Sequence, residues 1–508
     1  MRDVTLFAVA GDARAAAERL LDDAEVAWLP ARRATCTVLD TFDGRIRAAG
    51  LVLQIESPGG RRLVVLGDEM MEAPLPGRIL PRLPGSLPAG PIRDRIAPLM
   101  GTRVLLASQS FTSTRTEGVI RGADGALTAR LVRHERLRVA DSALTGLALL
   151  EMHRVAGHRR FARELVARLT GAGVPRRRGS AGDLATAALD RPPVRFDNSP
   201  TVPLDPEIRS ADGFRLVLDH LASLVEATWD GVANRTDPEF LHDFRVAIRR
   251  TRSLLTAGRQ VLPDAEAEAA RAGLGRLAGA TSDARDLEVH LMEWGRYTAG
   301  LDASVIADLE PLKTLLSERL DAAYRQVAVT LNDDANRQIV AEWRRWLRTE
   351  HTELGEFGHQ PLGASVANLV LRAHRLLLQN GRLITAESPA AQLHDLRRDA
   401  KRLRYLLECF ASLMPAQPQR QFVKRLKLLQ DNLGQHQDAE VHVAQLSAFA
   451  EELQLRGVDH RVLLGMGRLS ERIDQRRLAA RSAFAVRFAE YDTRDTKLAL
   501  AEAIDHIR

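Results

Sequence analysis

Apolar residues recur every three or four positions along residues 393–414. The positions are Leu393, Leu396, Ala400, Leu403, Leu407, Phe410 and Met414. This spacing draws one stripe along a helix. Basic residues take the same spacing one position further on, at His394, Arg397, Lys401 and Arg404. Because each residue turns a helix by about 100°, the basic stripe lies beside the apolar seam and not opposite it.

The same pattern occurs once before, 152 residues earlier in the chain. LHDFRVAIRRTRSLL (residues 241–255) aligns with LHDLRRDAKRLRYLL (residues 393–407), and DARDLEVH (residues 283–290) aligns with QHQDAEVH (residues 435–442). The first copy carries its own stripe of cations, His242, Arg245, Arg249 and Arg252. Self-similarity at one offset indicates a duplicated helical unit. Two such helices packed seam against seam predict a groove with cations about 5–6 Å apart, which suits a polyanion.

Residues 1 to about 190 predict a mixed α+β domain. The strand-like runs are Thr35–Leu39, Leu51–Ile55, Leu63–Leu66, Val104–Ala107, Leu127–Val132 and Leu147–Glu151. Helical patterns fall at Ala13–Asp22 and Arg159–Leu169. Prolines between Pro74 and Pro91 indicate a connector, and a second proline cluster at 192–206 indicates a domain boundary. We therefore expect an N-terminal domain over 1–191, a Pro-rich linker over 192–207 and a C-terminal domain over 208–508.

From Phe214 onward helical patterns dominate and strand signals vanish. Asp237 and Pro238 are typical of an N-cap and first helical residue ahead of the first basic stretch. Further helices are expected over 301–347 (one or two), 365–380, 421–429 with Lys424, Arg425 and Lys427, and 461 to about 491. The C-terminal domain should be an all-α bundle of two pseudo-repeats, about 208–355 and 360–508.

Composition narrows the class of protein. A chain of 508 residues suggests two to four domains, and 27% charged residues are ordinary for a globular protein. Two cysteines, Cys36 and Cys409, rule out a disulfide framework and fit a reducing compartment. The N-terminal apolar run is too short and too acidic for a signal peptide, and no apolar stretch is long enough to span a bilayer. These features predict a cytoplasmic protein.

The paired LHD[FL]R…[RK]RxR helices and the DARDLEV and LQDNLGQHQD segments that follow them resemble the CHAD domain, the conserved-histidine α-helical domain. The resemblance covers about 212–508. It implies two four-helix halves around a basic surface that binds inorganic polyphosphate, with members associated with polyphosphate granules. Carried over by motif, the polyphosphate-binding residues would be His242, Arg245, Arg249, Arg252, His394, Arg397, Lys401, Arg404, Lys424 and Lys427.

The N-terminal domain resembles the CYTH, or triphosphate tunnel, family in LDTFDGRIRAAGLVLQIES (residues 39–57) and LALLEMHRVAGHRRFARELVARL (residues 147–169). That resemblance implies an antiparallel tunnel or barrel-like fold. The family's ExExK strand corresponds here to VTLFAVA, which lacks carboxylates and lysine. Two arginines of its LRxR strand are Gln54 and Glu56, and its late ExE survives as Glu151 with His153. The expected domain is therefore a degenerate tunnel without its catalytic motif.

These patterns favour a non-catalytic polyphosphate-binding protein that needs no cofactor, uses no metal ligands and is associated with granules. One alternative is a metal-dependent triphosphatase or polyphosphatase in the N-terminal domain, which would need Mg²⁺ or Mn²⁺ held by carboxylates. Another is a nucleic-acid-binding protein, but aromatic residues are 5% of the chain and only Tyr405 borders the stripes. His242 and His394 can be either packed, hydrogen-bonded histidines or cations favoured by a bound polyanion.

Overall fold

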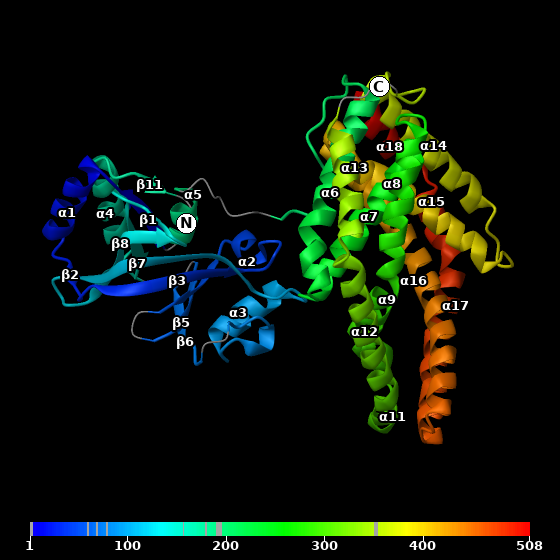
Figure 1. Cartoon of the computed structure of the whole chain (residues 1–508), viewed down its shortest axis with the longest axis horizontal. Coiled ribbons are helices and arrows are strands. Elements are labelled where there is room, and N and C mark those ends of the chain that lie inside the picture. Colours follow the sequence, from blue (N-terminus) through cyan, green and yellow to red (C-terminus); the bar gives the residue numbers. More distant parts are fainter. Residues whose placement is uncertain are drawn as a thin grey trace. The chain divides into compact units, whose positions relative to one another are not determined.

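The computed structural model describes residues 4–57, 60–67, 70–77, 80–155, 157–177, 180–188, 196–349 and 354–507. Contacts divide the chain into two compact units, residues 1–197 and 198–508 (Figure 1). The division lies within the proline-rich stretch at 192–207. Among the described residues, none of the helices combines the length and the apolar composition needed to cross a bilayer.

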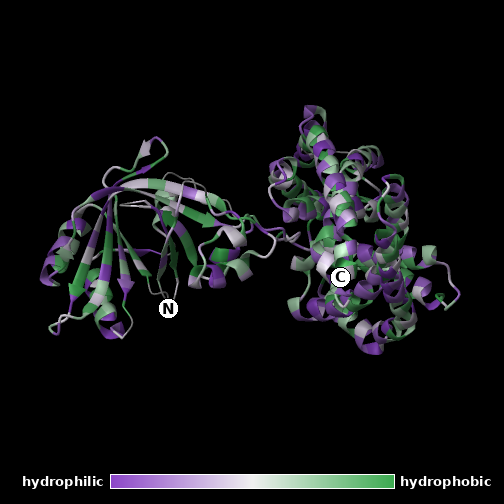
Figure 2. Cartoon of the chain, turned by 90° about the horizontal axis from the view of Figure 1, so that it is seen from below, coloured by the Kyte–Doolittle hydropathy of each residue, from purple (hydrophilic) through white to green (hydrophobic). Residues whose placement is uncertain are grey.

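The strands of the N-terminal unit form one antiparallel sheet. Its order is β11-β1-β10-β8-β7-β3-β4-β5-β6, with β2 paired to β7 and β9 to β8. The strands are β1 (Val4–Val9), β2 (Ala27–Trp28), β3 (Arg32–Asp40), β4 (Val52–Glu56), β5 (Arg62–Leu66), β6 (Met71–Pro74), β7 (Leu106–Arg121), β8 (Leu127–Val139), β9 (Ser142–Ala143), β10 (Ala148–Arg154) and β11 (Arg176–Arg177). The sheet is strongly curved (Figure 2), which is consistent with a tunnel-like fold.

Strand β7 extends well past the short run that its sequence predicts. It continues from Leu106 to Arg121, and its buried positions include Gln109, Ser113 and Arg115. An alternation of apolar and polar residues is the usual signal of a strand. That signal is weak here because the buried positions of β7 mix polar residues with apolar ones such as Phe111 and Ile120.

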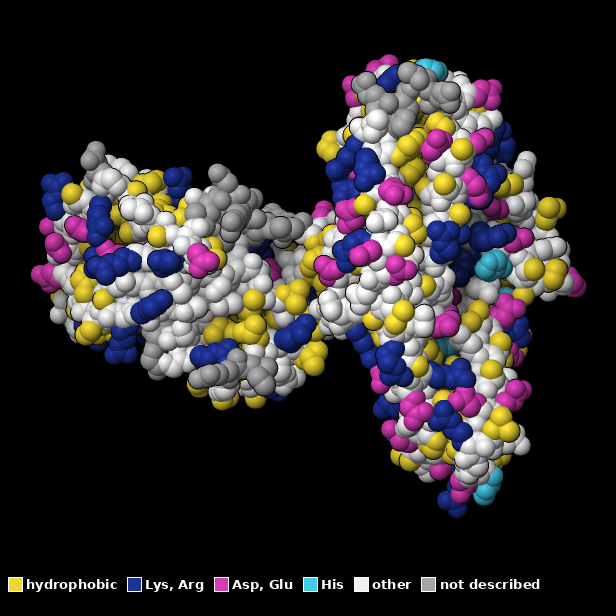
Figure 3. All heavy atoms as spheres, in the orientation of Figure 1, with side chains coloured by type: hydrophobic (Ala, Val, Ile, Leu, Met, Phe, Trp, Pro, Cys, Tyr) yellow, Lys and Arg dark blue, Asp and Glu magenta, His cyan; other side chains and the backbone are white. Residues whose placement is uncertain are grey.

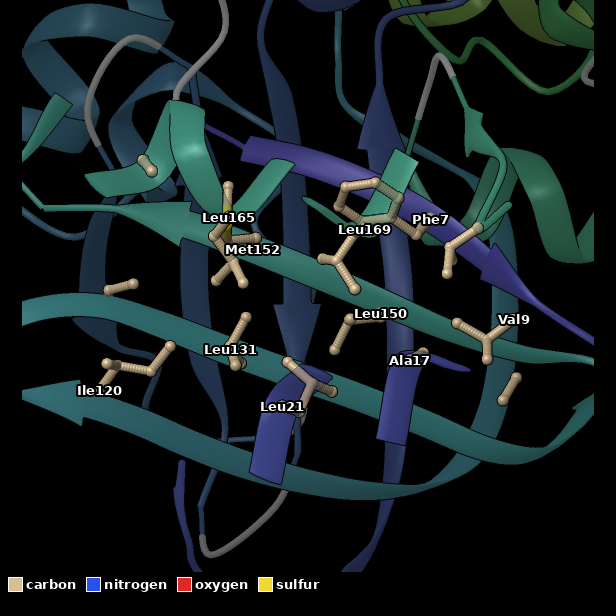
Figure 4. Close-up of a cluster of buried hydrophobic side chains, with 14 residues drawn as sticks. Phe7, Val9, Ala17, Leu21, Ile120, Leu131, Leu150, Met152, Leu165 and Leu169 are labelled. Atoms are coloured by element: carbon tan, nitrogen blue, oxygen red, sulfur yellow. The ribbon is translucent and has the colours of Figure 1, made fainter. Parts of the chain in front are cut away.

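Helices cover parts of this sheet. They are α1 (Asp12–Asp23), α2 (Arg45–Ala48), α3 (Pro91–Met100), α4 (Arg159–Gly171) and α5 (Ala181–Ala187), with a 3-10 turn, η1, at Pro84–Ser86. Leu21 of α1 and Leu165 of α4 pack against Leu131 and Met152 of the sheet (Figure 4). A second cluster lies under α2 and α3. The expected connector at 74–91 ends where Pro91 begins α3, a position at which proline is well tolerated.

The C-terminal unit is all-helical. Its helices are α6 (Ser210–Ala233), α7 (Pro238–Ala257), α8 (Asp264–Ala280), α9 (Ser282–Met292), α10 (Trp294–Thr298), α11 (Ala303–Asp308), α12 (Glu310–Leu331), α13 (Asp334–Arg348), α14 (Leu362–Arg382), α15 (Ala390–Cys409), α16 (Ala416–Leu455), α17 (His460–Tyr491) and α18 (Arg494–Ile504), with 3-10 turns η2 (Ala411–Leu413) and η3 (Asp505–Ile507). The stretch 301–347 forms three helices, because Pro311 starts α12 anew and Asp333 caps α13.

The duplication seen in the sequence sets the helix boundaries. The first residues of α6 and α14, of α7 and α15, and of α8 and α16 are each 152 residues apart, and α7 and α15 both contain 20 residues. The copies differ after that point, since α16 runs unbroken for 40 residues where the first copy breaks at Thr281 between α8 and α9. The Thr281 hydroxyl donates to the carbonyls of Leu277 and Ala278. The second copy has Leu433 at the matching position and cannot make these bonds.

Candidate functional site: a basic cavity shared by the two repeats

Helices α7 and α15 position the repeated cations. The side chain of Asp237 accepts hydrogen bonds from the backbone N–H groups of Glu239 and Phe240, at 3.0 and 3.2 Å, so the expected N-cap of α7 is confirmed. The apolar seams predicted for both helices are buried, including Phe244 and Ile248 in α7 and Leu396 and Leu403 in α15. Burial of the seams fixes which sides of the two helices carry the neighbouring cations.

A cavity of about 800 Å³ lies between α7, α10, α15, α16 and α17. Seven of its lining side chains are lysine or arginine, namely Arg249, Arg250, Arg296, Arg397, Lys401, Arg404 and Arg476. Its three acidic lining residues are Asp243, Asp431 and Asp438. In the space-filling view, lysine and arginine side chains lie in a hollow of the helical unit (Figure 3). Both repeats therefore contribute to one concave surface with an excess of positive charge, which we call the basic cavity.

Neighbouring acids pair with only part of this charge. Arg397 bonds Asp438 at 3.0 Å, and Arg296 bonds Glu293 at 2.7 Å. Glu408 accepts from Arg250 of α7 at 3.0 Å and from Arg404 of α15 at 2.5 Å.

Three further cations of the basic cavity lack an acidic partner among the described residues. They are Arg249, Lys401 and Arg476. Arg476 donates instead to the backbone carbonyl of Arg296 at 2.9 Å. A bound anion could therefore meet cations that are not already neutralised.

Burial and neighbouring positive charges shift the pKa values of titratable groups in the cavity. Burial, helped by the positive charges of Arg397 and Arg249, lowers the pKa of Lys401 to about 7. Burial and the Arg285 guanidinium lower the pKa of His242, whose Nδ1 lies 3.3 Å from that guanidinium. Burial and the neighbouring His290 lower the pKa of His442 to about 3. The free site thus disfavours additional positive charge, because burial and neighbouring cations act in the same direction.

Five of the ten residues predicted to bind polyphosphate line the basic cavity, namely His242, Arg249, Arg397, Lys401 and Arg404. Three others lie outside it but continue its stripes. His394 is one turn before Arg397 on α15, and its Nδ1 is 2.9 Å from the Gln437 side-chain oxygen. Lys424 and Lys427 are exposed on α16 and precede Asp431 at helical spacing on the same side.

Arg245 and Arg252 lie toward α8 and outside the basic cavity. Arg245 donates to the Ala278 carbonyl at 2.7 Å and to the Thr281 and Ser282 hydroxyls. The Arg252 guanidinium lies about 3.6 Å from the position that a Cβ on Gly275 would occupy. In α15 the matching residues, Arg397 and Arg404, do line the cavity, so the two copies present different sides to it.

Several lining residues were not among the predicted site residues. Arg250 had a signal, because it recurs as Arg402 in the second copy. Arg296 and Arg476 had none, since they come from α10 and α17 and belong to no repeated stripe. Both guanidinium groups lie over the ring of Tyr297, at 5.6 and 5.9 Å from its centre.

The enclosed face of the N-terminal sheet carries a second polar cluster. The Arg115 guanidinium bonds Glu56 at 3.2 Å and also pairs with Glu117, and Arg62 reaches Glu117 at 3.3 Å. These groups help to line a cavity of about 320 Å³. Glu56 thus forms an ion pair with a neighbouring arginine of the sheet.

Glu151 and His153 form a separate buried pair on β10, with the His153 Nε2 3.1 Å from the Glu151 carboxylate. Burial works to raise the pKa of Glu151, but the hydrogen bond with His153 and the nearby His134 bring it below its usual value. Among the residues that the structure describes, no three His, Cys, Asp or Glu side chains could hold one metal ion. Glu56 and Glu117 thus pair with arginine, and Glu151 pairs with histidine.

An all-helical unit in which two copies of one helix arrangement enclose a basic cavity defines a class of duplicated helical domains. Residues 215–447 match the family model of the CHAD domain, so the C-terminal unit contains a CHAD domain. A search of the curated proteins gives no match.

Several solved structures are similar to parts of the chain. The CHAD domain from the plant Ricinus communis is 23% identical, with 57% of this chain and 94% of that chain covered and a TM-score of 0.48. PptA from Streptomyces chartreusis is 17% identical, with 56% and 100% covered and a TM-score of 0.45. HpAC1 from Hippeastrum, described as having a dominant triphosphatase activity, is 16% identical, with 38% and 97% covered and a TM-score of 0.25.

Proposed function

We propose that the CHAD domain binds inorganic polyphosphate in the basic cavity. The observation that carries the proposal is that seven lysine and arginine side chains but only three aspartates line a cavity to which both repeats contribute. Arginine suits such a ligand because its planar guanidinium contacts phosphate oxygens with two donors and keeps its charge. The same ligand is the one implied by the CHAD-like motifs of the sequence.

The proposed contacts form an inner and an outer set. Arg249, Arg397, Lys401 and Arg404, with His242, would bind phosphates inside the cavity, and Arg250, Arg296 and Arg476 extend this set. Outside it, His394, Lys424 and Lys427 would guide a longer chain along α15 and α16. Arg245 and Arg252 would act through the packing of α7 on α8. A polymer that reaches both sets would hold the protein on a polyphosphate granule.

Nucleic acid is the competing polyanion. Proteins that bind single strands stack bases on exposed aromatic rings. The aromatic residues of the basic cavity, Tyr297 and Tyr405, are 5% and 7% exposed, and the Tyr297 hydroxyl is 2.7 Å from His442 Nδ1. With little aromatic surface on which bases could stack, a ligand made only of phosphates is favoured.

We further propose that the N-terminal unit is not a triphosphatase. Catalysis of this type requires carboxylates that hold a metal ion and cations that are free to meet the phosphates. Here Glu56 and Glu117 pair with Arg115, and Glu151 pairs with His153.

Charge reversal at two of the three cations that lack an acidic partner among the described residues tests the main proposal. The double substitution Arg249→Glu with Lys401→Glu should abolish binding of long-chain polyphosphate by the full chain, with little change in helicity or melting temperature. Titration calorimetry measures the binding, and circular dichroism measures the folding. The matched control is Arg325→Glu with Arg345→Glu, two exposed residues on α12 and α13 that should retain binding.

Two outcomes count against polyphosphate binding in this cavity. One is full binding by the cavity double variant. The other is displacement of polyphosphate by single-stranded or duplex DNA at equal phosphate concentration, which would favour a general polyanion site. Binding of either polymer should weaken with salt because counterions are released, so salt dependence alone does not separate them.

A further inference from the structure

Lys401 is the one cation of the two basic stripes whose residue type differs between the repeats. The His242, Arg245 and Arg252 positions recur as the same residue types, whereas Arg249 recurs as Lys401. An arginine keeps its proton at any pH that a protein meets, but a buried lysine can lose its own. The second repeat therefore has a cation that can lose its proton where the first repeat has an arginine that keeps its own.

The neighbours of Lys401 on its own helix and on α7 are mainly positive. Lys401 is partly buried and shares the basic cavity with Arg397 and Arg404 of α15 and with Arg249 and His242 of α7. Within the described parts of the chain, its ammonium group has no hydrogen-bond or ion-pair partner. The charges that surround it disfavour its protonated form.

The other helices around the cavity do not reverse this balance. From α16, Asp438 lowers the cost of the ammonium charge but is already bonded to Arg397. Asp431 and His442 of α16 also line the cavity, and Arg296 of α10 and Arg476 of α17 add positive charge. The remaining charged lining residues, Asp243 and Arg250 of α7, bond Asn198 and Glu408.

We propose that Lys401 takes up one proton when polyphosphate enters the basic cavity, so that the affinity for polyphosphate falls as pH rises above neutrality. This inference rests on the proposed function and adds a regulation to the same site. The geometry supports it. Lys401 and the surrounding arginines repel one another in the free protein, whereas a polyanion bound between them attracts all of them.

The direction of the effect follows from proton linkage. Burial and the neighbouring arginines lower the pKa of Lys401 to about 7 in the free protein. A bound polyanion favours the charged form and raises this pKa. Below pH 7 Lys401 is already protonated, so binding requires no proton. Above pH 7 binding requires proton uptake, and the affinity should fall by up to about tenfold per pH unit until the pKa of the complex is reached.

Titration calorimetry at pH 8 in buffers with different ionisation enthalpies measures this proton. The full chain is titrated with long-chain polyphosphate, whose few end groups contribute little titration. For the unmodified chain we expect the heat to depend on the buffer, with an uptake that approaches one proton per occupied cavity. For Lys401→Arg we expect binding without proton uptake and an affinity that is nearly constant from pH 7 to pH 9.

The outcomes separate this inference from the proposed function. Binding by the unmodified chain with the same heat in every buffer overturns the proton uptake. Equal uptake by Lys401→Arg assigns the proton to another group and also overturns it, whereas equal uptake by His242→Gln supports it. If Lys401→Arg fails to fold, Lys401→Met gives a second check. This variant should bind polyphosphate weakly and without proton uptake. Absence of any binding by the unmodified chain refutes the proposed function itself.

Discussion

Glu408 links the two repeats at the scale of single residues. Its carboxylate accepts from Arg250 of α7 and from Arg404 of α15, and both arginines line the basic cavity. The carboxylate therefore holds two guanidinium groups in place while it neutralises part of their charge. Positioning of the two arginines by Glu408 should strengthen anion binding, whereas the negative charge of Glu408 should weaken it.

Glu408→Gln should separate these two effects. Loss of the carboxylate should lower the free energy of unfolding by about 1–3 kcal/mol, because two partly buried arginines lose a charged acceptor. Polyphosphate binding should tighten severalfold, because the net positive charge of the cavity rises. Chemical denaturation and calorimetry measure the two quantities, with exposed Glu502→Gln on α18 as the control. Weaker binding would mean that Glu408 matters mainly by positioning the arginines.

The periodicity of the sequence predicted which sides of the helices carry the cations, but it did not predict which of these cations line the cavity. Periodicity correctly placed the buried seams on α7 and α15 and the cations beside them. It could not say how far each helix is rotated in the bundle. Arg245 therefore lies toward α8, whereas its counterpart Arg397 lines the cavity.

At the scale of elements, the start of the second repeat is closely packed. Gly363 lies in the first turn of α14, where a Cβ would be 2.2 Å from the carbonyl oxygen of Ile507 and 3.0 Å from Pro206 Cβ. The neighbouring atom is backbone and cannot turn away as a side chain could. The end of the described chain is thus packed directly on the start of α14.

Gly363→Ala should lower the free energy of unfolding by about 1–3 kcal/mol, because the added methyl overpacks this contact. Gly467→Ala is the matched control, since Gly467 lies within α17 with open space around its Cβ position. That control should raise the free energy of unfolding by about 0.5–1 kcal/mol, because glycine disfavours a helix interior. Equal effects of the two substitutions in urea denaturation would contradict the packing argument.

At the scale of the whole molecule, the two units differ in how their charges are used. The basic cavity of the CHAD domain has cations without acidic partners among the described residues, whereas the polar cluster of the N-terminal sheet pairs its arginines and carboxylates with one another. The first arrangement can accept an anion at once. The second would have to break ion pairs to do so.

The full chain should therefore release no phosphate from tripolyphosphate above the protein-free background, with either Mg²⁺ or Mn²⁺. A phosphate assay measures the release, and polyphosphate binding by the same preparation shows that the protein is folded. Release that disappears in Glu151→Ala would contradict the proposal and make the N-terminal unit an enzyme.

The sequence by itself determined the two-part organisation, the helical nature of residues after Phe214, the 152-residue duplication and the faces of the basic helices. These are consequences of local spacing, which the chain carries wherever it folds. Tertiary structure decided the rest. It brought Arg296 and Arg476 to the cavity from helices without a repeated stripe, turned Arg245 away and left Lys401 among arginines. Helix rotation and burial, which no periodicity contains, are the physical reason.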